Sequence, residues 1–380
     1  MVHSGRKILK ATQPVLLTLL SLGSALAQRP PDMKLDAGIN RQVVEGAIRA
    51  IKKYYVSAEV AKQVEEDLQR RLKNNEYDKI TSAYDFMDAL DAHMQGVSRD
   101  RHLALAYSYR PEPLLDGRDF DPETAAEKTE GRTAARARNF GFEKVERLPG
   151  NVGYLEMNSF VRPEFSGETA SSVMDFVANT DALIIDLRKS SGGSADMVLF
   201  LASYFFDEEP FHLGDWFVRA ENRTQQWWTL PYVPGSRYVG KDVYILVSRR
   251  SFSAVEGLAS ILQHHKRATI VGEKTSGGTH PGRMVRVHPN FAVFVPLSWF
   301  IYPTGTPSVP IDRPVYPTTK TDYQGAPVTP DIAVPASQAL KRAHLEALTK
   351  KLEREPSQKE RLEPIIQGLK KELEEMTPKP

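Results

Sequence analysis

Two continuous apolar runs near the middle of the chain constrain its fold more than any other feature. Residues 182–187 read ALIIDL and residues 243–247 read VYILV. Such runs are typical of strands covered on both faces, because a strand with one solvent-exposed face alternates polar and apolar residues. Helical spacing follows each run, and further strand signals complete an alternation that predicts an α/β domain with a largely parallel sheet. These further segments are Met197–Phe206, Ala254–Gln263, Val152–Leu155 and Thr269–Val271.

The regions on either side of this alternation have a different character. Residues 36–95 contain no proline and place apolar residues every three to four positions, which predicts a unit of three helices. Residues 109–138 are charged and without a usable period, so we expect a mobile connector or surface loop there. A hairpin is expected around Pro289-Asn290, and a charged helix broken near Pro356 is expected from Ala339 onward.

These differences predict five parts along the chain. They are a signal peptide at 1–27, a helical N-terminal domain at 28–108, a charged linker at 109–138, a core domain at 139–340 and a charged helical tail at 341–380. The tail is rich in Lys, Glu and Leu, so it is a candidate for assembly into a homo-oligomer. A solvated helix explains the same composition.

The first 27 residues have the composition of a secretory leader. Arg6, Lys7 and Lys10 precede an apolar run from Val15 to Leu26, which ends in Ala25-Leu26-Ala27. The run is about a dozen residues, shorter than the roughly 20 that a membrane span needs. We therefore expect an exported chain, periplasmic or extracellular, with no integral membrane span once the leader is removed. A retained N-terminal anchor is the alternative.

Charge and cysteine content exclude several classes of function. The chain has 50 Lys and Arg, 48 Asp and Glu, and no cysteine. A near-neutral balance gives no electrostatic case for a nucleic-acid partner. The lack of cysteine excludes a disulfide scaffold, a zinc-finger framework, an iron–sulfur protein and a thiol nucleophile.

A serine-bearing turn at residues 243–262, VYILVSRRSFSAVEGLASIL, is the segment most suggestive of chemistry. A buried strand ends at Val247, the turn carries Ser251 and Ser253, and a helix follows with Glu256 in its first turn. A serine here has its hydroxyl at the carboxyl edge of the sheet, close to helical N–H groups that can stabilise an oxyanion. The alternative is an ordinary helix N-cap.

A second turn, DLRKSSGGSAD at residues 186–196, also lies between a buried strand and a helix. Gly192 and Gly193 permit a tight turn whose exposed N–H groups can form half of an anion hole. The segment has neither the GxxxxGK[ST] nor the GxGxxG spacing, which argues against nucleotide binding. An ordinary turn is the alternative.

A serine nucleophile needs a base, and the chain offers nine histidines. His102, in GVSRDRHLALAY, lies at the end of the helical unit, and His280, in GEKTSGGTHPG, is its main rival. His264 and His265 are adjacent on a helix and point about 100° apart, which suits no shared metal. The HExxH spacing is absent, and nothing in the sequence calls for a metal or an organic cofactor.

Taken together, several segments resemble the tail-specific, or C-terminal-processing, serine peptidases. The branch of the tricorn core protease and of the interphotoreceptor retinoid-binding protein repeats is the more similar one. The segments are NFGFEKVERLPGNVGYLEMNSF, DALIIDLRKSSGG, SFSAVEGLA, ATIVGEKTSGGTHP and VTPDIAVPASQALKRA, and the helical unit ending in DRHLAL is also similar to this branch.

The resemblance implies a fold, a reaction and a set of site residues. It implies an α/β core of the crotonase/ClpP-like sheet-and-helix kind and hydrolysis of peptides or unfolded proteins. Ser253 would be the nucleophile, while the N–H of Ala254 and an N–H of the Gly192–Gly193 turn would form the oxyanion hole.

The expected base follows from a departure from the classical branch. The slot of the catalytic lysine holds Gly278, and Lys274 stands at another position, so a Ser–Lys dyad is not expected. The tricorn-like branch uses a histidine before the main domain, and His102 occupies that place. His280 and Glu256 remain candidates for supporting roles.

Two more departures concern polar groups near the expected site. Ser190 replaces an asparagine in the glycine turn, which we expect to change its hydrogen bonding only slightly. Gln324 stands where related sequences often have glutamate, and an amide would support an imidazolium less well than a charged acid. We also see no room for a PDZ-like module in residues 109–138.

These departures leave a second hypothesis open. A non-catalytic protein on the same fold would bind hydrophobic ligands or peptides in an apolar groove. Trp216, Phe217, Trp227 and Trp228 could line such a groove. Ordinary core packing of these aromatic side chains is the simpler interpretation, and we favour it.

Overall fold

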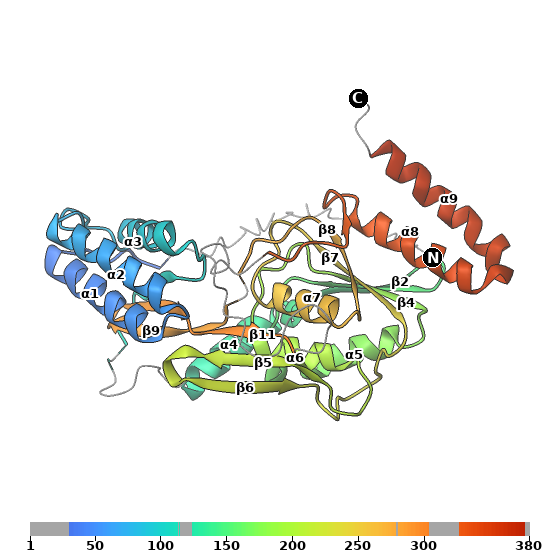
Figure 1. The fold of residues 1–380 in the computed structure, drawn as a ribbon, viewed down its shortest axis with the longest axis horizontal. Coiled ribbons are helices and arrows are strands. Elements are labelled where there is room, and N and C mark those ends of the chain that lie inside the picture. Colours follow the sequence, from blue (N-terminus) through green and yellow to red (C-terminus); the bar gives the residue numbers. More distant parts are fainter. Residues whose placement is uncertain (1–29, 113, 115–123, 279, 304–326, 377–380) are drawn as a thin grey trace, which may run out of the picture. The chain divides into compact units, whose positions relative to one another are not determined.

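A six-stranded sheet forms the centre of the fold in the computed structural model (Figure 1). The strand order is β12-β8-β7-β4-β3-β2, and all neighbours are parallel except β2, which is antiparallel to β3. This confirms the predicted largely parallel sheet. The strands are β2 (Phe142–Leu148), β3 (Val152–Met157), β4 (Ala182–Asp186), β7 (Asp242–Val247), β8 (Thr269–Gly272) and β12 (Ile332–Ala333).

The structure describes residues 30–112, 114, 124–278, 280–303 and 327–376. The expected leader at 1–27 and Gln324 lie outside the described residues. No helix within these ranges is long and apolar enough to cross a membrane.

Helices cover both faces of the central sheet, which explains the continuous apolar runs. Leu183 and Ile185 of β4 face the core under α5 (Pro163–Val177), α6 (Ala195–Ser203) and α7 (Ala254–His264). Their neighbours Ala182 and Ile184 face the opposite core, under α8 (Ala339–Arg354).

The tail helix therefore closes one face of the sheet. The 3-10 turn η3 (Pro356–Gln358) interrupts the tail helix at Pro356, where the break was predicted. Helix α9 (Lys359–Glu375) then folds back on α8 and buries Leu362 and Ile366 in the core beneath α8. An assembly role for this tail stays a prediction.

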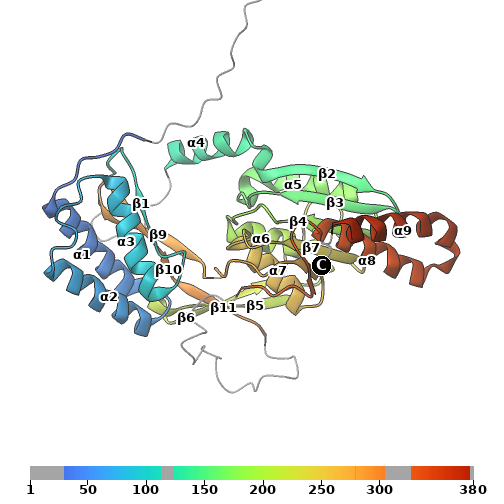
Figure 2. The ribbon, with the colours of Figure 1, turned by 90° about the horizontal axis from the view of Figure 1, so that it is seen from above.

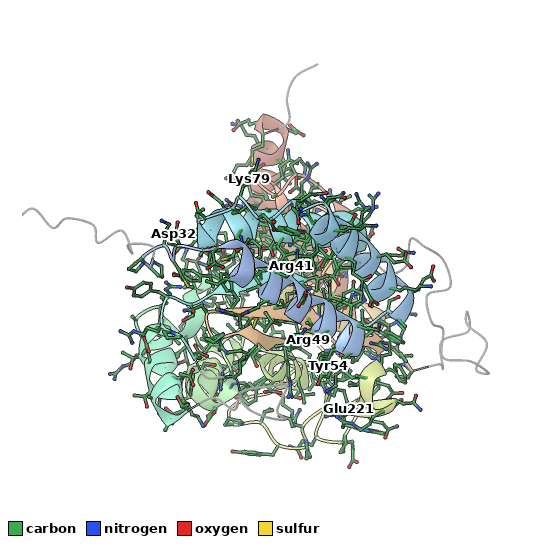
Figure 3. All side chains as sticks on the ribbon, turned by 90° about the vertical axis from the view of Figure 1, so that its left-hand side faces the viewer. Asp32, Arg41, Arg49, Tyr54, Lys79 and Glu221 are labelled. Carbon is green, nitrogen blue, oxygen red and sulfur yellow. The ribbon has the colours of Figure 1, made fainter. Side chains whose placement is uncertain are left out.

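The predicted three-helix unit is confirmed. It consists of α1 (Ala37–Tyr54), α2 (Ala58–Lys73) and α3 (Ala83–Ser98), which begin after the capping side chains of Asp36, Ser57 and Ser82. Figure 3 views this unit from its outer end, with Arg41 and Arg49 on the solvent side of α1.

The core of the helical unit is completed by a hairpin from far along the chain. Strands β9 (Gly282–His288) and β10 (Phe291–Pro296) form the hairpin expected around Pro289-Asn290. They join β1 (Ala104–Tyr107) in one sheet beside α1–α3 (Figure 2). Val285, Phe291 and Val293 pack among the residues of these helices. The helical core is thus built from two separate segments.

A second small sheet links the helical unit to the rest of the molecule. It consists of β5 (His212–Val218), β6 (Arg223–Trp228) and β11 (Ser298–Ile301) in the order β11-β5-β6. At the turn between β5 and β6, η2 (Arg219–Glu221) places the Arg219 guanidinium against α1. The guanidinium donates to the carbonyls of Lys52, Lys53 and Tyr55, where that helix ends.

The expected linker contains a helix, so the prediction of a loop is wrong for residues 125–136. Helix α4 (Ala125–Arg136) begins at a capping box between Thr124 and Glu127, and 3-10 turn η1 (Asn139–Gly141) follows it. None of its residues is buried. A helix without a buried face has no apolar stripe, so the periodicity on which the prediction relied was missing. The capping box was the available signal.

The packing of α1 against β9 yields a prediction about stability. A Cβ atom on Gly46 would lie 2.7 Å from the Val287 Cβ and 2.9 Å from the Val287 carbonyl oxygen. We expect Gly46→Ala to lower the free energy of unfolding by about 1–3 kcal/mol, measured by urea denaturation.

Gly96→Ala on α3 is the matched control, because a Cβ there meets no atom within 4 Å. It should raise the free energy of unfolding by roughly 0.5–1 kcal/mol, since alanine costs less entropy in a helix. Equal stability of the two variants would contradict the close contact between α1 and β9.

Candidate active site

A cavity of about 620 Å³ brings together several of the predicted site residues. Ser253, Ala254, Gly193 and His280 all line it. His102 lies beside it: its ring stands 4.3 Å, centroid to centroid, from the ring of Phe252, the residue before Ser253. The structure therefore gathers residues from the serine turn, the glycine turn and the loop that follows β8.

The backbone of Ser253 sets it apart from the ordinary helix caps of this protein. Asp36, Ser57 and Ser82 cap their helices with φ between −129° and −99°. Ser253, at the start of α7, has φ 59° and ψ −120°, a conformation that favours glycine. Holding a side-chain-bearing residue there costs about 1–3 kcal/mol, and such strain clusters at functional sites.

A buried carboxylate holds this strained turn. Glu256 accepts hydrogen bonds from the Ser253 N–H (2.9 Å), the Gly277 N–H (2.7 Å) and the Thr275 hydroxyl. Burial raises the pKa of Glu256, while the hydrogen bonds it accepts oppose that change. One side chain thus connects the serine turn to residues 275–277, in the loop that leads to His280.

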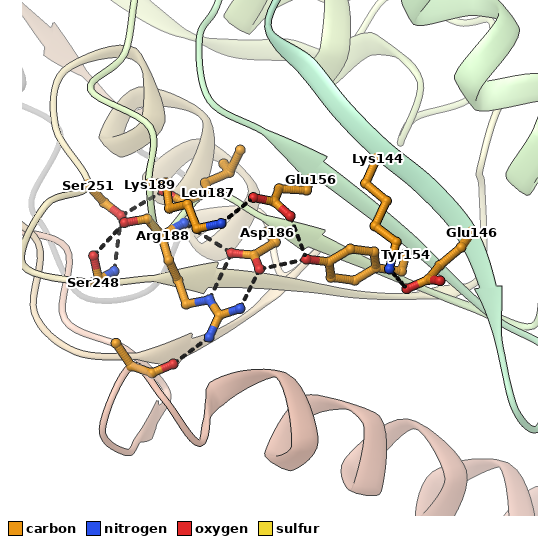
Figure 4. A network of polar contacts seen from close by, with 11 residues as sticks. Lys144, Glu146, Tyr154, Glu156, Asp186, Leu187, Arg188, Lys189, Ser248 and Ser251 are labelled. Carbon is orange, nitrogen blue, oxygen red and sulfur yellow. Dashed lines mark hydrogen bonds and ion pairs between the residues drawn. The ribbon is translucent and has the colours of Figure 1, made fainter. Parts of the chain in front are cut away.

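Two serines align the serine turn with the neighbouring strand end. Ser251 Oγ donates to the Leu187 carbonyl (2.9 Å) and accepts from the Ser248 N–H (3.0 Å), while Ser248 Oγ donates to the Arg188 carbonyl (2.6 Å). Figure 4 shows these bonds between the ends of β7 and β4. Ser251 is therefore a structural side chain, and its hydroxyl is already engaged.

The end of β4 is itself anchored by an ion pair (Figure 4). The Arg188 guanidinium donates to both carboxylate oxygens of Asp186 and to the carbonyl of Ala336. The Tyr154 hydroxyl donates to the same carboxylate at 2.8 Å. Buried, charge-assisted hydrogen bonds of this kind fix the direction in which the chain leaves the sheet toward the glycine turn.

The glycine turn lies directly against the serine turn. Gly192 and Gly193 have φ 100° and 143°, and a Cβ on Gly192 would lie 2.7 Å from the Ser253 Cβ and 2.8 Å from the Ala254 nitrogen. The Gly192 N–H faces Ser190 Oγ at 3.4 Å. The close approach explains why this position requires glycine.

The slot of the classical catalytic lysine also requires glycine. Gly278 lines the cavity, and a Cβ there would lie 2.0 Å from the Phe252 ring. Lys274 is exposed. That no Ser–Lys dyad operates here stays a prediction.

Asp100 is a buried carboxylate that the sequence analysis missed, and both candidate histidines lie beside it. Its Oδ1 accepts from the backbone N–H of His102 (2.9 Å) and lies 3.8 Å from His102 Nδ1. Its Oδ2 lies 3.3 Å from His280 Nδ1 and accepts from the Tyr55 hydroxyl (3.2 Å). The Asp-x-His spacing of residues 100–102 was the signal available in the sequence.

Burial and charge act in opposite directions on these groups. Burial alone would raise the pKa of Asp100, but hydrogen bonds and the charges of the two histidines lower it below its ordinary value. Burial lowers the pKa of His102, with the nearby Asp100 charge opposing. The lowered pKa favours the neutral imidazole of His102, which is the form that accepts a proton. Within the described ranges, no group of three or more His, Asp or Glu side chains is placed to hold a metal ion.

Comparison with known protein families assigns the chain to one of them. The model of peptidase family S41 matches residues 151–334, and the model of the N-terminal domain of Peptidase_S41 in eukaryotic IRBP matches residues 33–136. The first range contains Ser253 and the second contains His102. The chain belongs to peptidase family S41.

Individual relatives match over shorter stretches. A carboxy-terminal-processing protease of Bartonella bacilliformis is 25% identical over 193 residues, which are 50% of this chain and 40% of that protein. A carboxyl-terminal-processing protease of Synechocystis sp. is 32% identical over 133 residues, 34% of this chain and 29% of that protein. The chain thus matches less than half the length of these curated relatives.

Solved structures resemble the fold over most of the chain. Mature CPAF has a TM-score of 0.51 at 11% identity and covers 82% of this chain and 98% of its own. A lipoprotein from Streptococcus agalactiae has a TM-score of 0.50 at 13% identity and covers 85% and 98%. The likeness concerns the fold. An α/β sheet-and-helix core after a helical N-terminal region, as predicted, is confirmed.

The bonds of Glu256 yield the second prediction. Glu256→Gln replaces one acceptor oxygen with an NH₂ donor facing other donors. We expect the free energy of unfolding to fall by about 1–3 kcal/mol, because a buried donor is left without an acceptor.

Glu164→Gln is the control for this prediction, since Glu164 lies in the first turn of α5 and is exposed. It should change the free energy of unfolding by less than about 0.5 kcal/mol. If both variants unfold at the same urea concentration as the wild type, Glu256 does not hold the serine turn.

Proposed function

We propose that this chain is a serine peptidase that hydrolyses peptide bonds in peptides or unfolded proteins. The observation that carries the proposal is the strained turn that presents Ser253 to a cavity beside the glycine turn. Membership of peptidase family S41 supports the same reaction. The basic and apolar leader at 1–27 further supports export.

The proposed reaction uses Ser253 as the nucleophile and His102 as the base. Ser253 Oγ attacks the substrate carbonyl carbon while His102 takes its proton. The resulting oxyanion accepts hydrogen bonds from the backbone N–H groups of Gly193, which lines the cavity, and Ala254. His102 then protonates the leaving amine, and a water hydrolyses the acyl-enzyme in the reverse sequence of proton transfers.

Asp100 has the position of the acid that orients the base. Its Oδ1 faces His102, while Tyr55 and His280 hold Oδ2. The 3.8 Å between Asp100 Oδ1 and His102 Nδ1 exceeds a hydrogen bond. Catalytic hydrogen bonds are often long in ligand-free structures and shorten when substrate binds. The charge expected of a glutamate at position 324 would then come from Asp100.

The second candidate function is a non-catalytic binder of hydrophobic ligands or peptides. The aromatic side chains around the cavity support it, among them Trp216 and Trp227. Such a protein would bind without forming a covalent bond to Ser253. Covalent labelling therefore separates the two functions.

The labelling of Ser253 is the third prediction. An active-site phosphonate should add one group to the folded wild-type chain at Ser253, detected by mass spectrometry, and new termini should appear in an unfolded protein mixture. Ser253→Ala should abolish labelling and lower turnover roughly 10⁴-fold or more.

Ser172→Ala is the control, because Ser172 is an exposed serine of α5. It should be labelled like the wild type. A folded wild-type chain that neither takes the label at Ser253 nor cleaves protein would reject the peptidase and leave the binder.

The pH dependence of labelling is the fourth prediction. The rate should fall as the pH drops through the pKa of His102, which burial holds below its ordinary value of about 6.5. Because the Asp100 charge raises that pKa, Asp100→Asn should move the acid limb to lower pH. It should also reduce the plateau rate by roughly 10²–10⁴-fold through loss of orientation.

Three further variants assign the roles. His102→Ala should lose labelling, while His280→Ala should keep it at a reduced rate. His344→Asn is the control for a buried histidine, since His344 bonds the Pro149 carbonyl from α8; it should leave the acid limb in place. Loss of labelling in His280→Ala, with labelling retained in His102→Ala, would make His280 the base.

A further inference from the structure

The cavity beside Ser253 has an aromatic wall built mainly by the small sheet β11-β5-β6, whose strand β11 is far from the other two in the sequence. Trp216 of β5 stacks on Trp227 of β6 with ring centroids 4.6 Å apart. The Phe300 ring stands edge-on to both, at 6.1 and 5.9 Å. Phe294, Trp299 and Tyr302 line the same cavity. The rings therefore form one continuous apolar surface.

The alternation of β6 separates this wall from the outer surface. Trp227 is 8% exposed and lines the cavity, whereas its neighbour Trp228 is 43% exposed and stacks on His212. Adjacent residues of a strand point to opposite faces. The two expected interpretations of these aromatics, core packing and groove lining, thus both hold for Trp227.

The opposite wall is one face of α7, the helix that begins directly after Ser253. Ala254, Gly257 and Ile261 line the cavity, at the spacing of one side of a helix. A Cβ on Gly257 would meet only the Val198 side chain, at 3.8 Å. Gly257 thus leaves room in the cavity without needing a conformation that only glycine adopts.

Charge is scarce around the cavity. Of the described residues that line it, none is Lys, Arg, Asp or Glu. A charged side chain placed among these rings would lose its hydration without gaining a partner. An apolar ring or branched chain would instead gain contact with aromatic faces on one side and α7 on the other.

We infer that the cavity binds one bulky apolar side chain, aromatic or branched aliphatic, of the residue next to the scissile bond. The inference rests on the proposed peptidase function, because it places this side chain relative to the bond that Ser253 attacks. Trp227 and Gly257 are the residues that determine the preference: Trp227 supplies the apolar wall, and Gly257 supplies the space.

Peptides capped at both ends test this preference, because only one side chain then varies. The panel carries Phe, Leu, Ala, Asp or Lys at a single position in an otherwise small and polar sequence. Cleavage is located by mass spectrometry. For the wild type, kcat/KM for cleavage beside Phe and Leu should be about 10–100-fold above the value for Ala. The values for Asp and Lys should be lower than the value for Ala.

Variants of the two walls should each weaken the preference for Phe, and each should affect a different ratio. Gly257→Leu fills the cavity and should lower the ratio of kcat/KM for Phe over Ala by at least about tenfold. Trp227→Ala should reduce the ratio of Phe over Asp. Trp228→Ala, the matched control one residue away, should preserve both ratios. If Gly257→Leu fails to fold, Gly257→Ala provides a smaller change in the same direction.

The experiment separates failure of the inference from failure of the peptidase function. Cleavage without a preference for Phe or Leu, or a preference unmoved by Gly257→Leu and Trp227→Ala, overturns the pocket while the peptidase stands. Binding of the Phe peptide to Ser253→Ala, detected by tryptophan quenching, supports the pocket even if the wild type shows no turnover. Neither binding nor cleavage of any peptide overturns both.

Discussion

The site depends on one buried carboxylate. Glu256 accepts from the backbone N–H of Ser253, the N–H of Gly277 and the hydroxyl of Thr275. The first of these bonds offsets part of the cost of the unusual φ and ψ at Ser253, because it gives the Ser253 N–H an acceptor. The other two hold the loop after β8 against α7. The positions of the serine, of Gly278 and of His280 therefore share one point of attachment.

The second constraint is the joint between the helical unit and the sheet. Asp100, at the end of the helical unit, is bonded to His280 from the loop after β8, and the same carboxylate is held by Tyr55 at the end of α1. Arg219, at the turn between β5 and β6, bonds the carbonyl of that tyrosine. The positions of Asp100 and His280 thus depend on contacts among three separate parts of the chain.

Sequence patterns predicted the parts of the fold that local physics determines. The buried strands, the helices after them and the three-helix unit each have a period or an apolar run of their own, and Ser253 and Gly193 could be found at the turns between them. The Asp-x-His spacing alone did not single out Asp100, because its contacts with His280 and Tyr55 join distant positions in the sequence. Helix α4 was missed because its exposed surface leaves no apolar stripe. Of the four aromatic residues proposed for a groove, Trp216 and Trp227 line the cavity, whereas Phe217 and Trp228 are not among its lining residues. The geometry of the wall depends on the pairing of β5 with β11, which no local pattern encodes.

The hairpin that completes the helical unit has a consequence for the order of folding. Residues of β1 pair with residues of β10, as Ala104 does with Phe294, and most of the core domain lies between these partners in the sequence. Such non-local pairing is slow, because the loop between the partners must close before the contact is gained. During synthesis the three helices emerge first. Their apolar core stays incomplete until residues 282–296, which form β9 and β10, have left the ribosome. The turn that bears His102 and Asp100 is placed only at that moment. His102, the proposed base, is therefore placed only after the residues around Ser253, the proposed nucleophile, have been synthesised.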